Sequence, residues 1–407
     1  MLLVLRNRRF AALFASQVSS LAATGLLTVA LALVAVRLDP AGAAGIIATA
    51  LTIRIAVYVV VSPLASALLA GRSSRAVLIT ADLVRFAVAV ALVLATAPWQ
   101  LYLGIVLLQT ASAVFTPTYQ AVIPRVLPDE RDYTAAQSLS RLAYDLESLL
   151  SPPLAALLVL VLPPQSLFAV TALGFLGSAL GVLLARLHHQ VGSTAEPVGR
   201  RLVRGIGVLL RTPGPRFAAV LDAAAATIYA TVLVSSVGLL IDAGVDPVDP
   251  SAQLALVLVA FGLGSIAVAL ALPALLRVVR DTTLMLLGAS LAVVALAATS
   301  AAALLGGLST AAIAVLWTLL GASSSAISTP SARLIRAEVP AEQHAAVFAA
   351  RFSTSHAWYA ITYPVAGVLG TVAAPGIATA VLGGIAAASV VAGVALSTPW
   401  PRRGTPD

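Results

Sequence analysis

Long apolar stretches alternate with short polar breaks along the whole chain. Each stretch is close to the roughly 20 residues that a helix needs to cross about 30 Å of hydrocarbon. The breaks are rich in proline and glycine, which end helices and turn the chain, as in the segments RLDPAG and VAAPG. This pattern predicts an all-α integral membrane protein.

Twelve stretches of this kind predict twelve transmembrane helices. The first six are expected at residues 10–36, 43–70, 77–97, 99–122, 134–162 and 165–187. The last six are expected at residues 216–241, 252–276, 283–302, 305–330, 345–371 and 374–397. We therefore expect an N-terminal six-helix bundle at residues 1–187, a linker at 188–215, a C-terminal six-helix bundle at 216–398 and a tail at 399–407.

The composition agrees with a chain that lies mostly in lipid. Hydrophobic residues make up 60% of the chain and charged residues 10%, and the mean hydropathy is +1.02. A soluble domain has an apolar share of roughly 45 to 50%.

The residues that the chain lacks exclude several kinds of chemistry. It has no cysteine, which excludes disulfides and thiolate metal sites. Its four histidines contain no His-x-x-x-His pair, so no metal or other cofactor is expected. It also has no lysine and therefore lacks the phosphate-binding loop of ATP-driven machines. Uphill transport would need an ion gradient or a separate subunit.

The arginines predict how the chain is oriented. All 24 basic residues are arginine, and only Arg37 falls in the loops expected on one side of the membrane. Nineteen fall in the termini, the linker and the loops of the other side. The positive-inside rule then places both termini and the linker in the cytoplasm. The net charge of +8 is a topology signal, because the arginines form no patch typical of nucleic-acid binding.

One stretch occurs twice, half a chain apart. The segment AVFTPTYQAVIPRVLPDER at Ala113–Arg131 aligns with AISTPSARLIRAEVPAEQH at Ala326–His344. Pro117 then corresponds to Pro330. Each copy begins in an apolar helix, crosses a polar turn and enters the next helix. This predicts a parallel repeat of six plus six helices, as found in secondary transporters.

Several segments together resemble the major facilitator superfamily, most closely its bacterial efflux branch of drug or siderophore exporters. They are RNRRFAALFASQVSSLAATGL, LLAGRSSRAVLITADLVR, PTYQAVIPRVLPDERDYTAAQSLSR and SPPLAA. The resemblance covers essentially the whole chain. It implies two bundles that alternate access around a central cavity, in the bacterial plasma (inner) membrane. In the loop after the second helix, this chain has the two arginines of the family motif, Arg72 and Arg75, but lacks the acidic residue of that motif. In the fifth helix, Pro152 is the one residue of the family's antiporter motif that this chain retains.

Charged residues inside the predicted spans are costly and therefore candidates for function. Those for proton coupling or charge balance are Arg54, Arg141, Asp145, Glu147, Asp222 and His356. Arg54 lies about 16 Å from the outer end of its helix, near the midplane, where an acid of the fifth helix is its natural partner. A purely structural ion pair is the alternative.

The two acids of the fifth helix are expected to face different surroundings. Arg141 and Asp145 are spaced to pair along one helix face, whereas Glu147 lies roughly 200° around the helix from Asp145. We favour Asp145 as the functional acid because it continues the face of Arg141, with Glu147 as the alternative. His356 suits proton exchange or packing through a hydrogen bond. Asp222 suits a transport role or a solvated cavity mouth.

The resemblance also implies a cytoplasmic gate, formed by Arg72, Arg75, Asp82 and Arg85, although these residues could equally be topology anchors. Polar residues without charge that could line the cavity, or pack in the core, are Gln17, Gln109, Tyr229 and Trp317. The linker segment Gly199–Leu210 alternates basic and apolar residues at helical spacing. It is expected to lie on the anionic inner leaflet or to be a solvated linker.

The sequence thus predicts a monomeric secondary transporter that exports small apolar or amphipathic compounds in exchange for protons. Its expected partners are a small-molecule substrate, protons and the lipid bilayer. Import of a metabolite and proton-independent facilitation are the alternatives. An enzyme is not expected, because no paired histidine and acid or serine-nucleophile motif occurs near the membrane interface.

Overall fold

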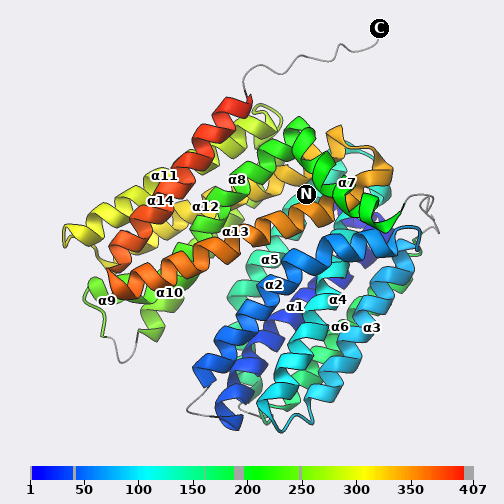
Figure 1. Ribbon diagram of the computed structural model, residues 1–407, viewed down its shortest axis with the longest axis horizontal. Coiled ribbons are helices and arrows are strands. Elements are labelled where there is room, and N and C mark those ends of the chain that lie inside the picture. The colour runs from blue at the N-terminus through cyan, green and yellow to red at the C-terminus, as the bar shows by residue number, and fades with distance from the viewer. Residues whose placement is uncertain (1, 40–42, 160, 188–196, 247–249, 398–407) are drawn as a thin grey trace. The chain divides into compact units, whose positions relative to one another are not determined.

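The computed structural model describes residues 2–39, 43–159, 161–187, 197–246 and 250–397, and within these ranges it contains helices and no strand (Figure 1). The first helices are α1 (Arg8–Leu38), α2 (Ala43–Leu69), α3 (Ser74–Leu92), α4 (Pro98–Val126), α5 (Glu130–Val159) and α6 (Ser166–Leu184). A short 3-10 helix, Leu2–Arg6, precedes them, and α7 (Val198–Arg211) follows in the linker.

The second half continues with α8 (Pro213–Ala230), a π-helical turn (Thr231–Ser235) and α9 (Ser236–Asp242), which together form the seventh span. The remaining helices are α10 (Ser251–Leu275), α11 (Asp281–Leu304), α12 (Thr310–Glu338), α13 (His344–Val372) and α14 (Pro375–Ser397), with a 3-10 turn at Ala341–Gln343. In the part of the chain that the structure describes, each of the twelve predicted spans therefore corresponds to a long helical segment.

Nine of these segments, among the described residues, are long and apolar enough to cross a membrane by length and composition. The other three are α3, α5 and α13, which carry more charged or polar side chains. Charged residues are tolerated in such helices when they face other helices rather than lipid. These three helices are accordingly the ones that supply most of the buried ion pairs and polar contacts described below.

Helices α4 and α12 end several residues later than the sequence predicts. The fourth predicted helix ends at residue 122 and the tenth at residue 330, but α4 continues to Val126 and α12 to Glu338. Pro117 and Pro330 lie inside these helices, which is tolerated because neighbouring helices satisfy the freed backbone groups. The two prolines hold equivalent places in equivalent helices, as the repeat requires.

The described chain divides into two compact units. Unit 1 comprises Met1–Leu209, Ala269–Pro273 and Ile335–Ala360, and unit 2 comprises Leu210–Val268, Ala274–Leu334 and Ile361–Asp407. Besides α1 to α6, unit 1 therefore contains α7 up to Leu209, a short piece of α10, the last turn of α12 and the first half of α13. The second half of α13 belongs to unit 2.

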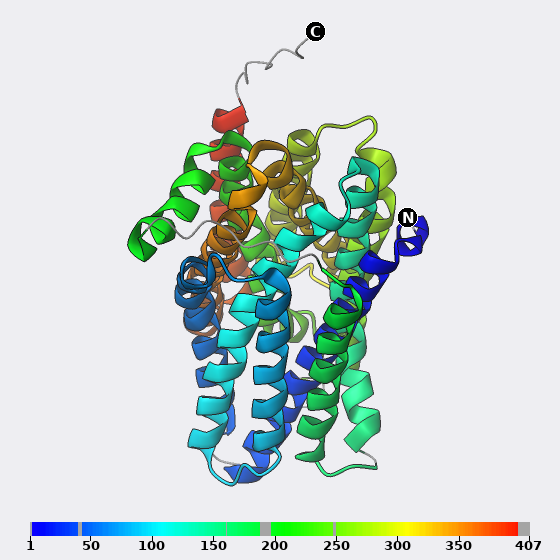
Figure 2. The ribbon, with the colours of Figure 1, turned by 90° about the vertical axis from the view of Figure 1, so that its right-hand side faces the viewer.

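Close helix packing in unit 1 depends on small residues. Helix α6 packs on α1 and α3, and Figure 2 shows these helices side by side in blue to green. Its contact with α1 runs through Gly174, Gly177 and Gly181. A Cβ atom at Gly181 would lie 2.9 Å from the carbonyl oxygen of Ala12 on α1. Such contacts let two backbones approach closely, which is the main way that helices associate in lipid.

Unit 2 repeats this pairing of helices. Helix α14 packs on α8 and α11, as α6 packs on α1 and α3. The crossing of α10 and α12 is tighter still. A Cβ atom at Gly321 would lie 1.9 Å from the carbonyl oxygen of Phe261, and one at Gly264 would lie 1.9 Å from that of Thr318. Only glycine fits at either position.

Gly321→Ala should therefore destabilise the protein by about 1–3 kcal/mol, because the added methyl group overpacks the crossing of α10 and α12. Gly384→Ala on α14 is the matched control, since a Cβ atom there meets nothing within 4 Å. Thermal unfolding of the two variants in detergent measures the difference. Equal melting temperatures for both variants would show that α10 and α12 do not cross this closely.

Candidate functional site

A polar cluster in unit 1 joins α2, α4 and α13 around the side chain of Tyr58. The Tyr58 hydroxyl donates a hydrogen bond to Oε1 of Gln109 over 2.6 Å. The Arg54 guanidinium lies 5.6 Å from the centre of the Tyr58 ring, and the His356 ring meets Tyr58 edge-on at 4.7 Å. Arg54 and Tyr58 are one helical turn apart, so they share a face of α2. Three of the predicted site residues thus meet at one tyrosine that the sequence did not single out.

Glu147 on α5 lies close to this cluster. It accepts a hydrogen bond from Ser151 and lies within Coulombic range of Arg54. Gly25 on α1 makes room for it, since a Cβ atom there would lie 2.6 Å from Oε1 of Glu147 and 1.8 Å from Oγ of Ser151. Ser151 and the space at Gly25 therefore allow the Glu147 carboxylate to lie against α1, within Coulombic range of Arg54 on α2.

Asp145 is held by a different cation. Its carboxylate pairs with the Arg141 guanidinium at 3.1 Å along α5, and its side chain is 5% exposed. The predicted separation of the two acids around the helix is therefore what the structure shows: Arg141 beside Asp145, and Arg54 near Glu147. We favoured Asp145 from the sequence, but this arrangement favours Glu147 as the acid of the Tyr58 cluster.

A second polar cluster lies around Gln17 on α1. Tyr119 on α4 and Ser140 on α5 donate to Oε1 of Gln17 over 3.1 and 2.8 Å. Tyr144 on α5 also bonds to the Gln17 side chain. Gln17 is only 5% exposed, so its amide oxygen serves as a shared acceptor that links three helices. The sequence pointed to Gln17 but not to the three hydroxyls around it.

Asp82 and Arg85 form a buried ion pair inside unit 1. Arg85 donates to the Asp82 carboxylate and, over 2.9 Å, to Oγ of Ser20. Ser178 donates to Oδ2 of Asp82 over 2.8 Å. The Arg85 guanidinium also lies over the ring of Phe115 at 4.3 Å. The pair therefore ties α3 to α1, α4 and α6.

These contacts differ from the partners that we predicted, which were Arg72 and Arg75. Asp82 lies eight residues beyond Ser74, the first residue of α3, or about 12 Å along the helix. Its carboxylate instead meets Arg85 and Ser178 in the bundle interior. A gate role for the four residues remains a prediction.

The predicted cavity residues of unit 2 lie near its π-helical turn. Ser324 donates to the Tyr229 hydroxyl over 3.2 Å, and Nε1 of Trp317 donates to Oγ of Ser236 over 3.0 Å. Trp317 has no exposed surface, and Asp222 on α8 is 4% exposed. π-Helical turns inside α-helices occur often at functional sites, and this one begins two residues after Tyr229.

The two copies of the sequence repeat also meet within unit 1. Nη2 of Arg125 at the end of α4 donates to the carbonyl oxygen of Ala341 over 3.2 Å. Arg336 at the end of α12 donates to the carbonyl oxygen of Pro128 and lies over the ring of Tyr133 at 4.6 Å. In each copy, an arginine at a helix end thus binds the turn of the other copy. We call these two contacts the reciprocal clasp.

Sequence reasoning missed the clasp, although its signal is present. Each copy has an arginine three or four residues before its turn proline, as in Arg125 with Pro128 and Arg336 with Pro340.

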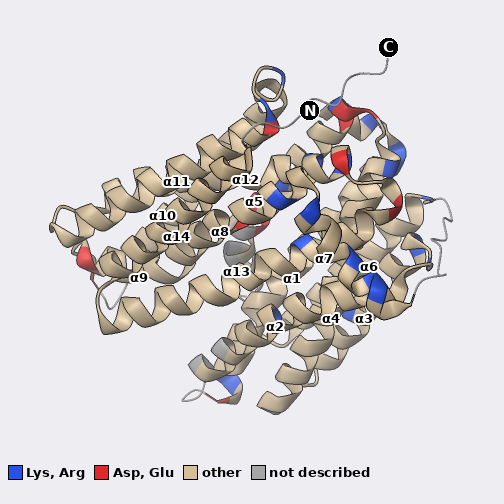
Figure 3. Ribbon diagram, turned by 45° about the horizontal axis from the view of Figure 1, so that its top comes forward, with Lys and Arg blue, Asp and Glu red and all other residues tan. Residues whose placement is uncertain are grey.

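Figure 3 shows that basic residues gather at helix ends and around α7, while most positions along the long helices are uncharged. Among the described residues, no group of three or more His, Asp or Glu side chains could hold a metal ion.

The chain is similar to known transporters. The sequence profile described as Major Facilitator Superfamily matches residues 13–312, about three quarters of the chain. The human organic anion transporter MFSD10 (TETRAN) has a TM-score of 0.73 at 12% identity, covering 95% of this chain and 99% of that one. A bacterial homologue of the iron transporter ferroportin, in an outward-facing state, has a TM-score of 0.77 at 14% identity, covering 96% and 100%. No curated protein sequence matches.

The ion pair between Asp82 and Arg85 can be tested by the effect of each charge on the stability of the protein. Asp82→Asn leaves Arg85 as a buried cation without its acid and should cost about 3–5 kcal/mol of stability. The double variant Asp82→Asn with Arg85→Gln removes both charges and should regain much of that loss. Thermal unfolding of the two variants in detergent measures this. A double variant no more stable than Asp82→Asn would contradict the pairing.

Proposed function

Because this chain belongs to the major facilitator superfamily, we propose that it exports small apolar or amphipathic compounds in exchange for protons. The chain is a multi-pass membrane transporter of small molecules and not an enzyme, so the proposal concerns direction, substrate class and coupling. The observation that carries it is the placement of Glu147 near Arg54, at the edge of the Tyr58 cluster. An acid with one cation inside a membrane bundle is a natural site for a moving proton.

In this proposal Glu147 exchanges the proton. When Glu147 is charged, Arg54 and Ser151 hold its carboxylate, which links α5 to α2. Protonation removes this attraction, while the contact of Arg54 with the Tyr58 ring does not depend on the charge of Glu147. The edge-on contact between Tyr58 and His356 extends the same cluster to α13. A proton could thereby change how three helices pack, which is what coupling to alternating access requires.

The reciprocal clasp is proposed as part of the cytoplasmic gate, beside Arg72, Arg75, Asp82 and Arg85. Its two arginine contacts to backbone carbonyls involve turns of both repeat copies. Such bonds at exposed helix ends are individually weak, so they can form and break during a transport cycle. The ion pair of Asp82 and Arg85 would act as the fixed support of α3.

Substrate class and direction rest on the character of the spans. Few charges lie inside the membrane, and four of them form the ion pairs Asp82–Arg85 and Arg141–Asp145, which favours a substrate of low charge. The resemblance to the bacterial efflux branch favours export from a monomer in the plasma membrane, with both termini in the cytoplasm. Import of a metabolite, or facilitation without protons, is the alternative that the following test distinguishes.

Glu147→Gln should reduce substrate-driven proton movement at least about tenfold, because the amide cannot release a proton. Proton flux in proteoliposomes, during a screen of lipophilic cations and small natural products, measures this. Glu130→Gln is the matched control, since it makes the same change at an exposed position of the same helix. Asp145→Asn shows which acid couples. Full proton flux in Glu147→Gln, or substrate movement without protons in the wild type, would exclude the proposed coupling.

The proposed orientation can be tested with single cysteines, because the natural chain has none. Gly199 in the linker and Gly307 between α11 and α12 both have open space around them. A membrane-impermeant maleimide should label Gly307→Cys in intact cells and Gly199→Cys only after permeabilisation. The reverse pattern would place the linker outside the cell.

A further inference from the structure

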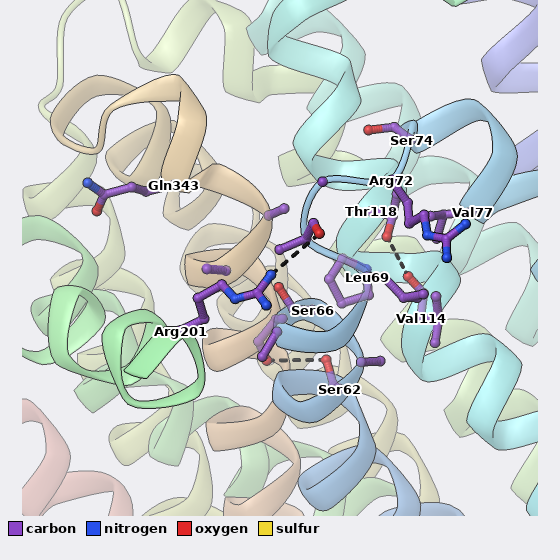
Figure 4. A pocket seen from close by; sticks show the side chains of 18 of the residues that line it. Ser62, Ser66, Leu69, Arg72, Ser74, Val77, Val114, Thr118, Arg201 and Gln343 are labelled. Carbon is purple, nitrogen blue, oxygen red and sulfur yellow. Dashed lines mark hydrogen bonds between the residues drawn. The ribbon is translucent and has the colours of Figure 1, made fainter. Parts of the chain in front are cut away.

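A cavity of about 480 Å³ opens at the helix ends of unit 1, close to the reciprocal clasp. It lies where the end of α2, the start of α3, the second half of α4, the linker helix α7 and the first turns of α13 come together (Figure 4). Its size is within the range of about 300–1,000 Å³ typical of ligand pockets. The Tyr58 cluster contributes none of its lining residues, so this is a separate site.

The cavity is strongly basic. Four arginines line it, Arg72, Arg125, Arg201 and Arg204, against one acid, Glu342, which gives a formal charge of four minus one, or +3. None of the ion pairs found in the described residues involves Arg72, Arg125 or Arg201. Cations gathered in one cavity repel each other, so a bound anion would stabilise the arrangement.

Several N–H groups of Arg201 and Arg72 make no hydrogen bond with other described residues. Arg201 reaches across the cavity toward the loop after α2, where its Nη1 donates to the carbonyl oxygen of Ala70 at a long 3.4 Å (Figure 4). Its Nε is buried and has no hydrogen-bond partner among the described residues. The Arg72 side chain likewise makes no hydrogen bond or ion pair with any residue that the structure describes. A planar guanidinium with free donors matches the oxygen atoms of a phosphate group.

Hydroxyl groups complete the lining. Ser66 on α2 and Ser74 on α3 both border the cavity (Figure 4). Hydroxyls can donate to the remaining oxygen atoms of an anion. The arginines thus provide charge and the serines provide further donors, a combination that fits a phosphate better than a simple halide.

The helix that carries Arg201 has the composition of a membrane-surface helix. On its exposed side, Val203 is 68% and Leu210 is 49% exposed, beside the exposed Arg200 and Arg211. Its other side is fixed to α13, because a Cβ atom at Gly205 would lie 2.7 Å from the carbonyl oxygen of Ala346. Apolar and basic side chains on one exposed face are typical of helices at an anionic lipid surface.

We propose that this cavity binds the phosphate group of an anionic lipid, with Arg201 and Arg72 as its main ligands. The apolar exposed face of α7 places the cavity at the level of lipid headgroups, which favours a lipid over a free phosphate. A bound headgroup would connect α7 with the loop between α2 and α3. Arg125 lines the same cavity and belongs to the reciprocal clasp, so the lipid would also stabilise the clasp.

The test compares two neighbouring arginines of α7 in the purified full-length protein. Dioleoylphosphatidylglycerol, dioleoylphosphatidylcholine and inorganic phosphate are titrated separately in detergent, and the rise in melting temperature gives an apparent Kd. Arg201→Gln should weaken phosphatidylglycerol binding about tenfold, the effect of losing one bidentate guanidinium contact. Arg200→Gln removes the same charge one residue away, outside the cavity, and should stay within about twofold of the wild type.

Each outcome decides the proposal. A selective effect of phosphatidylglycerol that depends on Arg201 but not on Arg200 supports it. Inorganic phosphate acting equally well, with the same dependence on Arg201, would replace the lipid by a soluble anion. Equal losses in both variants would show unspecific charge attraction, and no effect of either anion would exclude the site. Unchanged melting temperatures of both variants in phosphatidylcholine confirm that folding is intact. The assay measures binding alone and does not depend on the proposed transport activity.

Discussion

The need to satisfy charged groups inside a hydrocarbon layer governs this structure. A helix that crosses the bilayer satisfies its own backbone, but its charged side chains must find partners on neighbouring helices. In unit 1 Asp82 meets Arg85, and Asp145 meets Arg141. The helices that carry these pairs, α3 and α5, are also among the three predicted spans that are less apolar than the other nine. Their polarity is compatible with the membrane because the bundle supplies the partners.

The charged groups of unit 1 meet this constraint in two different ways. The pair of Asp82 and Arg85 is enclosed by serines and aromatic rings, which suits a fixed connection between helices. Arg54 lies 5.6 Å from the centre of the Tyr58 ring and within Coulombic range of Glu147. These two neighbours are the basis of our proposal that α2 and α5 couple transport to protons, with α3 as a support.

Duplication explains the contacts at the helix ends. Each of the two helix–turn–helix copies supplies an arginine near the end of its first helix and a turn carbonyl, although the arginines do not align exactly, so a contact from one copy to the other can occur in both directions. The basic cavity lies beside this clasp and shares Arg125 with it. The arginines from which we predict the orientation of the chain are thus partly the ones that we propose to bind an anion, because both roles need arginines at helix ends.

The sequence by itself determined the membrane class, the positions of the helices, the repeat and the family, because apolar length, proline spacing and arginine distribution are local properties of the chain. It also named two acids of one helix, Asp145 and Glu147, as candidates for proton coupling. Only the tertiary structure associated Glu147 with Arg54, placed Tyr58 between Gln109 and His356, and paired Asp82 with Arg85 instead of the loop arginines. The direction in which a polar side chain points depends on the rotation and packing of neighbouring helices, and spacing along one helix does not contain that information.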